Sequence, residues 1–239
     1  MKRLVLFDID GTLLNGGKLW REVFEGAFIK VFPGRTFPNV SFSGKTDRQI
    51  CAEVLEELTW KPEASDSRDA VIERLIQEYL KVLSRELRAG RGAEVELLPG
   101  VVELLGELRS CPQVRLGLLT GNVREGARLK LGTKGLSQYF GSPELTGAFG
   151  DDHSDRYVLP GIAVKRIEAE SGIRYRGREV IIIGDTPHDV NCGRSIGVKA
   201  IAVGTGRAEY QQALLASGPD YFFNDLRETQ QVMQALLGD

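Results

Sequence analysis

Three short apolar segments of this chain each run directly into a polar turn, and this repeated pattern limits the possible folds more than any other feature. Residues 3–9 are rich in β-forming side chains and lead into Asp-Gly-Thr-Leu-Leu, in which Gly11 marks a turn. Residues 114–119 lead into Thr-Gly-Asn, and residues 180–183 lead into Gly-Asp-Thr. Apolar runs of this length predict strands that are buried on both faces of a sheet.

Helical patterns separate the predicted strands. Two further strands are predicted at 200–203 and 221–223. Amphipathic stretches that predict helices lie near 101–109, 123–132, 161–171, 188–196, 207–216 and 225–237. Strands that alternate with helices predict an α/β fold with a Rossmann-like parallel sheet covered by helices on both faces.

A long segment near the N-terminus breaks this alternation. It has few strand signals, and its helical patterns lie near 19–31, 46–58 and 67–88. Gly-Gly precedes it and Leu-Pro-Gly follows it, which are turn-forming sequences that favour hinges. We therefore predict a helical cap domain, residues 16–95, inserted into a core that residues 1–15 and 96–239 form together.

Polar residues that follow the predicted strands form a set suited to phosphate chemistry. In an open α/β sheet, ligands bind beyond the carboxyl ends of the strands, where these residues are expected to converge. They are Asp8, Asp10, Thr120, Asp185 and Asp189. Closely packed carboxylates need a cation to stay ionised together, and an all-oxygen ligand set suits magnesium. A carboxylate can attack a phosphoryl group to form an aspartyl phosphate, while a hydroxyl and backbone N–H groups bind the phosphoryl oxygens. The set thus favours a magnesium-assisted phosphatase.

Three motifs in this order resemble those of the haloacid dehalogenase-like superfamily. They are Asp-x-Asp-Gly-Thr-Leu at 8–13, Thr-Gly-Asn at 120–122 and Gly-Asp-Thr-x-x-Asp at 184–189. The resemblance is strongest to the phosphoglycolate phosphatase and β-phosphoglucomutase-like enzymes, which place a helical cap between the first two motifs. It covers nearly the whole chain. Each motif alone is weak evidence, whereas the ordered set is specific.

The resemblance implies a catalytic or binding role for each matching residue. Asp8 would be the nucleophile, and Asp10 the general acid and base that protonates the leaving group and activates water. Thr120 would bind the phosphate through its hydroxyl, and Gly121 and Asn122 would line the same loop.

The resemblance also implies a magnesium site. Asp185 would be a ligand, and the carboxylate of Asp8 and the main-chain carbonyl of Asp10 would complete the ligands from the protein. Asp189 would be a further ligand, or it would contact the ligands without binding the metal itself. Capping of the helix that begins nearby is an alternative role for Asp189.

The third motif of the family departs from its usual form here. Relatives place a lysine before the helix that precedes the last motif, where it neutralises the nucleophile and holds the phosphate. Arg156 occupies the matching place in this chain, and we predict that it takes this role, since an arginine can bridge carboxylate and phosphate. Lys165 is the alternative, although it lies more than a turn inside the predicted helix.

The segment 43–47 (Ser-Gly-Lys-Thr-Asp) in the predicted cap has two interpretations. It resembles the substrate-specificity loop of capped relatives, in which Gly44 would permit a tight turn and Lys45 would meet an anionic part of the substrate. It is equally typical of a helix start, with Thr46 as the N-cap residue and Gln49 three residues later.

Other polar and aromatic residues are expected to be structural. We predict that His153 and His188 are surface residues, and that the acidic residues of 151–155 form a solvated loop rather than a second metal site. The pair Trp20 and Phe24 is expected to pack inside the cap rather than to enclose a substrate.

Charge, apolar runs and cysteine spacing exclude several classes of function. With 31 basic and 33 acidic residues mixed along the chain, no basic block favours nucleic-acid binding. No apolar run approaches the roughly 20 residues that span a bilayer. Cys51, Cys111 and Cys192 have neither metal-site spacing nor the pattern of a disulfide framework. We expect a cytoplasmic protein without nucleic-acid or membrane partners, and the sequence does not indicate its oligomeric state.

The expected activity is hydrolysis of a small phosphate monoester, of the phosphoglycolate or sugar phosphate type, with Mg²⁺ as cofactor. Asp10 argues against the dehalogenase branch of the superfamily, whose members do not need this acid. A phosphomutase of the β-phosphoglucomutase type shares all the core residues and remains an alternative. A protein that binds a phosphorylated ligand without turnover is the alternative from another class.

Overall fold

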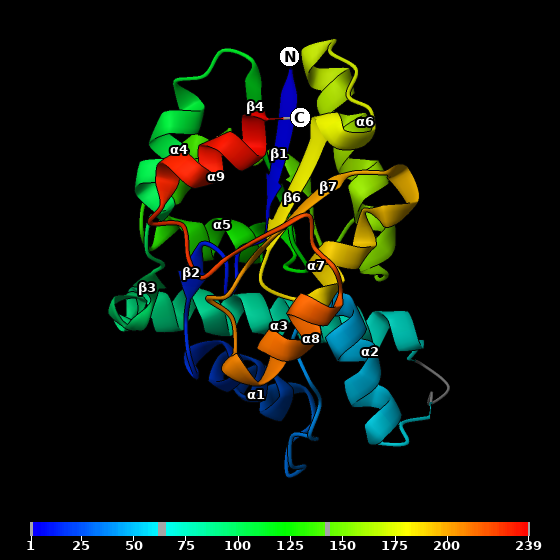
Figure 1. The fold of residues 1–239 in the computed structure, drawn as a ribbon. Helices are drawn as coiled ribbons and strands as arrows, with labels where there is room; N and C mark the ends of the chain where they lie inside the picture. Colours follow the sequence, from blue (N-terminus) through cyan, green and yellow to red (C-terminus); the bar gives the residue numbers. More distant parts are fainter. Residues whose placement is uncertain (1, 62–65, 142–143, 239) are drawn as a thin grey trace.

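A computed structural model describes residues 2–61, 66–141 and 144–238 of the chain. Within these residues, one sheet contains six parallel strands in the order β5-β4-β1-β6-β7-β8. Their bounds are β1 Arg3–Phe7, β4 Val114–Leu119, β5 Gly147–Ala148, β6 Val180–Gly184, β7 Lys199–Val203 and β8 Tyr221–Phe223. Helices cover both faces of the sheet (Figure 1), so the predicted α/β fold with a Rossmann-like parallel sheet is confirmed.

The side chains of β1 alternate between two buried layers, as expected of a strand in the middle of a parallel sheet. Val5 and Phe7 pack in the cluster that includes apolar residues of α4 Val101–Arg109, α5 Arg124–Gly132 and α9 Thr229–Leu237. Leu4 and Leu6 pack in the cluster that includes residues of α6 Leu159–Ser171 and α7 Pro187–Cys192. α8 Gln211–Ala216 packs beside α7. Strand β1 is therefore covered on both faces, and its carboxyl end opens at one edge of the core.

A group of three helices lies at that edge (Figure 1): α1 Leu19–Val31, α2 Asp47–Glu57 and α3 Arg68–Arg88. α1 packs along α3, with the rings of Phe24 and Tyr79 stacked 4.3 Å apart. Two of these helices begin at a hydroxyl that accepts from a backbone N–H of the first turn, since Thr46 caps α2 and Ser67 caps α3. The α1–α3 group is the segment for which the sequence predicts helices near 19–31, 46–58 and 67–88.

The chain enters and leaves the α1–α3 group through two adjacent short strands. β2 Leu14–Asn15 pairs with β3 Glu96–Leu97 in an antiparallel ladder. Neither strand is predicted from the sequence, because two residues carry no periodic signal. The ladder lies beside the predicted boundaries of the cap, and the division into two domains stays a prediction.

Several helix starts and ends differ from the sequence prediction. The helix predicted at 188–196 ends at Cys192, because Gly193 interrupts it and a separate 3-10 turn follows. The helix predicted at 207–216 starts at Gln211 after a 3-10 turn. The helix predicted at 225–237 starts at Thr229, since the carboxylate of Asp225 accepts from Arg227 N and forms a turn first.

No helix in the described part of the chain combines the length and the apolar character needed to cross a lipid bilayer.

Candidate active site

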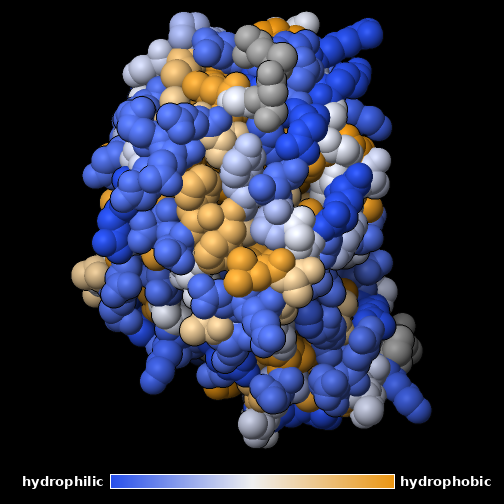
Figure 2. Space-filling model, viewed as in Figure 1, coloured by the Kyte–Doolittle hydropathy of each residue, from blue (hydrophilic) through white to orange (hydrophobic). Residues whose placement is uncertain are grey.

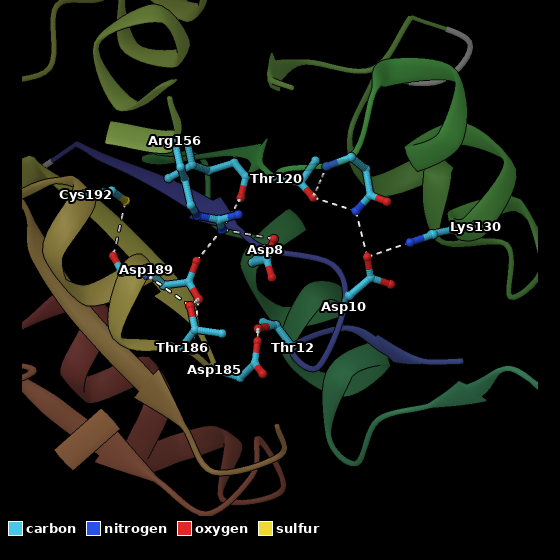
Figure 3. Close-up of polar contacts among 12 residues, drawn as sticks. Asp8, Asp10, Thr12, Thr120, Lys130, Arg156, Asp185, Thr186, Asp189 and Cys192 are labelled. Atoms are coloured by element: carbon cyan, nitrogen blue, oxygen red, sulfur yellow. Dashed lines mark hydrogen bonds and ion pairs between the residues drawn. The ribbon is translucent and has the colours of Figure 1, made fainter. Parts of the chain in front are cut away.

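Three carboxylates meet beyond the carboxyl ends of the central strands. Asp8 follows β1, Asp185 follows β6, and Asp189 lies in the first turn of α7 (Figure 3). Each offers an oxygen within 4.8 Å of the others, and all three residues are buried. The predicted convergence of these residues from distant parts of the sequence is therefore present in the structure.

Burial disfavours the charged forms of two of these acids, Asp8 and Asp185. It raises the pKa of Asp8 from 3.8 to about 7, with Asp189 and Asp10 adding to the increase and Arg156 opposing it. Burial also raises the pKa of Asp185 well above its usual value, and the charges of Asp189 and Asp8 act in the same direction. An all-oxygen set of closely placed carboxylates that resist ionisation fits a hard divalent cation such as Mg²⁺.

Arg156 is the cation that the protein itself places beside the nucleophile candidate. It is buried in the 3-10 turn Arg156–Val158, just before α6, and its Nη2 is 3.2 Å from Asp8 Oδ1. The same nitrogen donates to Asp189 Oδ1 and to the carbonyl oxygen of Leu119. Burial lowers the pKa of Arg156, but Asp189 and Asp8 more than offset this effect and raise it overall. Lys165 is exposed on α6, so the geometry favours Arg156 for the third motif.

Asp189 uses its two oxygens for different partners, so both of its predicted roles fit the geometry. Oδ2 accepts from the N–H and the hydroxyl of Thr186, while the hydroxyl of Thr186 caps the first turn of α7. This reciprocal capping holds the helix start in place. Oδ1 pairs with Arg156. Asp189 also belongs to the group of three carboxylates with Asp8 and Asp185.

Thr120 and Asn122 form a loop next to Asp10. Thr120 is fully buried, and its Oγ1 accepts from the backbone N–H of Asn122 at 3.3 Å and from its Nδ2 at 2.8 Å. The same Nδ2 lies 2.8 Å from Asp10 Oδ2 (Figure 3). The side chain of Asp10 thus lies outside the three-carboxylate group, and the predicted use of its main-chain carbonyl as a ligand stays a prediction.

The segment 43–47 is docked on this loop. The N–H of Asp47 donates to the carbonyl oxygen of Gly121 at 2.8 Å, and Asp47 Oδ2 accepts from Val123 N at 2.8 Å. The hydroxyl of Thr46 donates to the carbonyl oxygen of Ser154 at 2.6 Å. Any Cβ at Gly121 would overlap the carbonyl oxygen of Lys45, so only glycine allows this approach. The start of α2 and the 120–122 loop therefore form one contact surface.

Both interpretations of segment 43–47 find support. Thr46 accepts from Gln49 N at 3.1 Å, which confirms the helix start. Gly44 adopts φ +69° and faces the ring of His188. Lys45 lines the cavity described below, and its Nζ pairs with Glu53. Contact between Lys45 or Gly44 and a substrate stays a prediction.

The two histidines that we predicted to be surface residues differ in exposure. His153 is exposed and accepts from Asp155 N through its Nδ1. His188 is half-buried against Gly44, and burial together with the charge of Arg156 lowers its pKa. His188 is thus a partly exposed residue, since Gly44 and the ring of Tyr157 lie against it.

The acidic residues of 151–155 bind backbone N–H groups. Asp151 accepts from Arg124 N, Asp152 from Phe149 N and Asp155 from Tyr157 N. Asp152 also pairs with Arg166, at 2.6 Å. These contacts hold the backbone around residues 151–155 in place. That the acids do not form a second metal site stays a prediction.

A cavity of about 280 Å³ separates the carboxylates from the α1–α3 group. Its floor includes Asp8, Asp10 and Arg156, and its aromatic wall includes Trp20 and Phe24. Phe24 packs on other rings of the group, as we predicted. For Trp20 the prediction was incomplete, since Gly16 allows its ring to lie at the cavity wall.

Sequence reasoning missed two buried charged residues of this site. Lys130 of α5 pairs with Asp10 at 2.7 Å, and Asp47 of α2 caps the start of α5. A signal for Lys130 was available, because it lies on the helix face that also carries Ala127 and Leu131, where a lysine is unusual. The loop after β7 was also missed, although the hydroxyl of Thr205 donates to the carbonyl oxygen of Gly11 at 2.6 Å.

Sequence comparison finds relatives of this chain among known proteins. The sequence pattern of the haloacid dehalogenase-like hydrolases matches residues 2–197. A phosphoglycolate phosphatase of Synechococcus elongatus is 30% identical over 169 residues, which cover 69% of each chain. A pyrophosphatase of Halalkalibacterium halodurans, PpaX, is 28% identical over 200 residues, which cover 84% of this chain and 82% of the relative.

Solved structures share the fold. A hydrolase from Pseudomonas syringae superposes with a TM-score of 0.70 at 19% identity and covers 98% of both chains. The protein CbbY from Rhodobacter sphaeroides, solved with phosphate, superposes with a TM-score of 0.70 at 16% identity, covering 95% of this chain and 96% of the other.

Proposed function

The chain belongs to the haloacid dehalogenase-like hydrolase family, and we propose that it is a Mg²⁺-dependent phosphatase that hydrolyses a small phosphate monoester through an aspartyl phosphate on Asp8. Its relatives named phosphoglycolate phosphatase and pyrophosphatase support a phosphatase of this kind. The observation that carries the proposal is the contact of Arg156 with Asp8 beside two further buried carboxylates, at the floor of the cavity.

The proposed reaction has two steps. First, an oxygen of Asp8 bonds to phosphorus while the bond to the leaving oxygen breaks, and that oxygen takes a proton from Asp10. Next, a water oxygen bonds to phosphorus, its proton moves to Asp10, and the bond between phosphorus and Asp8 breaks. Arg156 and Thr120 hold the phosphoryl oxygens through both steps.

Asp8, Asp185 and Asp189 would hold the magnesium ion. When bound, the ion would supply positive charge that keeps these carboxylates ionised and neutralises the phosphoryl group. Thr12 supports the arrangement, since its hydroxyl donates to Asp185 Oδ1 at 3.3 Å.

We also propose that residues 16–95 act as the cap and residues 1–15 and 96–239 as the core. Asp47 contacts Gly121 and Val123, and Thr46 contacts Ser154. These contacts would let the cap close directly over a bound phosphate. Closure of this kind excludes bulk water and strengthens electrostatic contacts with the substrate. Gly44 and Lys45, at the cap side of the cavity, are the proposed contacts for the leaving group.

Magnesium is expected to raise the melting temperature more at pH 8 than at pH 5.5. The native pKa of Asp8 is raised to about 7 from 3.8, so without metal its contribution to stability falls as pH rises through this window. At pH 8 the ionised carboxylates bind Mg²⁺ without competition from protons, and binding to the native state raises its stability. Differential scanning fluorimetry at both pH values measures the two shifts.

Two variants, D185N and D47N, distinguish the loss of a magnesium ligand from a general effect of pH on stability. D185N should lose the magnesium shift at both pH values. D47N removes another acid whose pKa burial raises to about 7, and it should keep the shift. Equal shifts at the two pH values, or a shift that survives in D185N, would contradict the metal assignment.

Phosphate release from a substrate panel tests the activity itself. The panel contains phosphoglycolate, several sugar phosphates and pyrophosphate, each with and without Mg²⁺. Magnesium-dependent release from a monoester supports the proposal, while release from pyrophosphate alone would replace the monoester as substrate class. Turnover that requires a sugar bisphosphate and yields no phosphate would identify a mutase.

A further inference from the structure

Lys130 is buried where the core meets the α1–α3 group, and the proposed reaction gives it no role. It lies in the last turn of α5 with 3% of its surface exposed. Its Nζ is 2.7 Å from Asp10 Oδ2 and 4.5 Å from the centroid of the Trp20 ring (Figure 3 shows the contact with Asp10). Burial of an ammonium is unfavourable unless the group is paired. The carboxylate of Asp10 and the face of the Trp20 ring therefore stabilise the ammonium of Lys130 at this position.

The contact matters because it holds one particular oxygen of Asp10. Oδ2 accepts from two donors, Lys130 Nζ and Asn122 Nδ2. Oδ1 has no hydrogen-bond partner among the described residues. The orientation of the carboxylate therefore depends on the two donors to Oδ2, and removal of either one frees the side chain to rotate.

Two of the groups around the ammonium come from the α1–α3 group. Trp20 belongs to α1, and Asp47 belongs to α2. Burial raises the pKa of Asp47, and the positive charge of Lys130 opposes that increase, so the two charges interact across the contact surface. With these groups in place, the ammonium of Lys130 is buried where it meets Asp10, and burial strengthens its attraction to the carboxylate.

We propose that Lys130 is a positioning residue: together with Asn122 it fixes the carboxylate of Asp10, and Trp20 of the cap holds the ammonium in place. The proposal rests on the proposed function, because it gives Lys130 its effect through the proton transfers of Asp10. In the second step the water proton must move to Asp10 as the bond between phosphorus and Asp8 breaks. A base that rotates out of hydrogen-bond reach slows that step.

Burst kinetics with 4-nitrophenyl phosphate test this role, since 4-nitrophenolate leaves without a proton. K130M is expected to release the first equivalent of nitrophenol within about threefold of the wild-type rate, and then to turn over roughly 10- to 100-fold more slowly. Because the second step then limits turnover, KM should fall together with kcat, and kcat/KM should change little. K130R keeps a cation at this place and should recover part of the turnover. With phosphoglycolate, whose leaving oxygen needs a proton, K130M should also slow the first step.

Two neutral variants and one matched control make the test decisive. R128M removes the same charge from the same helix at a side chain that is 51% exposed, and it should behave as wild type. K130Q replaces K130M if the methionine variant does not fold, as judged by circular dichroism. Turnover within twofold of wild type in the neutral variant, or a burst that slows as much as the turnover, overturns the proposal.

The same experiment keeps this proposal apart from the proposed function. D8N is assayed in parallel with the Lys130 variants. A wild type without activity, or a D8N variant that retains it, refutes the phosphatase mechanism whatever the Lys130 variants do. An active wild type and an inactive D8N leave the mechanism in place, and the burst of K130M then decides the role of Lys130 alone.

Discussion

Replacement of Asp8 by asparagine is expected to lower the rate of phosphate release by about 10⁴-fold or more. The amide keeps the size of the side chain but cannot attack phosphorus. Because Asp8 is buried and its ionisation is disfavoured by burial and by Asp189, loss of its charge should not destabilise the fold. We therefore expect D8N to melt at or above the wild-type temperature in the absence of magnesium. The assay is phosphate release on the best substrate of the panel, together with a thermal melt.

A covalent intermediate gives this prediction a second measurement. Wild-type enzyme quenched in acid during turnover of a ³²P-labelled ester should carry label on the protein, and D8N should carry none. D69N serves as the control, since Asp69 is an exposed aspartate in the first turn of α3. Label on D8N, or activity within tenfold of wild type, would remove Asp8 from the nucleophile role.

Replacement of Arg156 by methionine is expected to destabilise the fold by about 3–5 kcal/mol, because it breaks a buried ion-pair group by removing one partner. Arg156 is 3% exposed and contacts both Asp8 and Asp189. Activity should fall roughly 10²- to 10³-fold, as expected for loss of one preorganised donor to the transferred group. Urea denaturation and phosphate release measure the two effects.

The destabilisation of R156M should depend on pH with a definite sign. Arg156 opposes the increase in the pKa of Asp8 and Asp185, so its loss raises both pKa values further. An acid whose pKa is raised in the native state lowers the free energy of unfolding as pH increases through that pKa. R156M should thus be closer to wild type at pH 5.5 than at pH 8, and a constant difference across this range would contradict the account.

Two controls accompany R156M. K165M changes the exposed alternative for the third motif and should leave both activity and stability unchanged. R166M breaks the bidentate pair of Arg166 with Asp152. Because the side chain of Arg166 is 30% exposed, this variant should lower the free energy of unfolding by under about 1 kcal/mol. A larger loss of activity in K165M than in R156M would return the role to the lysine.

Much of the core could be predicted because its signals are local. A parallel strand buried on both faces must be a short apolar run, and residues 3–9, 114–119 and 180–183 show that pattern without reference to any other part of the chain. Strands of two residues have no such signal, which is why β2, β3 and β5 were missed. The predicted helix starts were less accurate wherever a 3-10 turn or a turn formed by an aspartate precedes the helix, since the residues of such turns also occur in helices.

In the candidate site, too, the residues next to predicted strands could be predicted, whereas those within helices could not. Asp8, Thr120 and Asp185 follow predicted strands, and the edge of the sheet brings such positions together. Lys130 and Asp47 lie within helices, and their burial depends on how the α1–α3 group docks. The pair of Lys130 with Asp10 joins residues 120 positions apart, and Asp47 caps a helix 76 positions away.

The α/β class, the family motifs and the residues at the strand ends could be predicted without the structure, because each of these follows from the types and spacing of near neighbours. The folded structure was needed to show that Arg156 rather than Lys165 reaches Asp8. It also shows that Asp189 uses one oxygen for capping and the other for Arg156, and that Lys130 pairs with Asp10. The physical reason is that the energy of a buried charge depends on which opposite charges surround it. Those charges come from segments that approach one another only when the chain is folded.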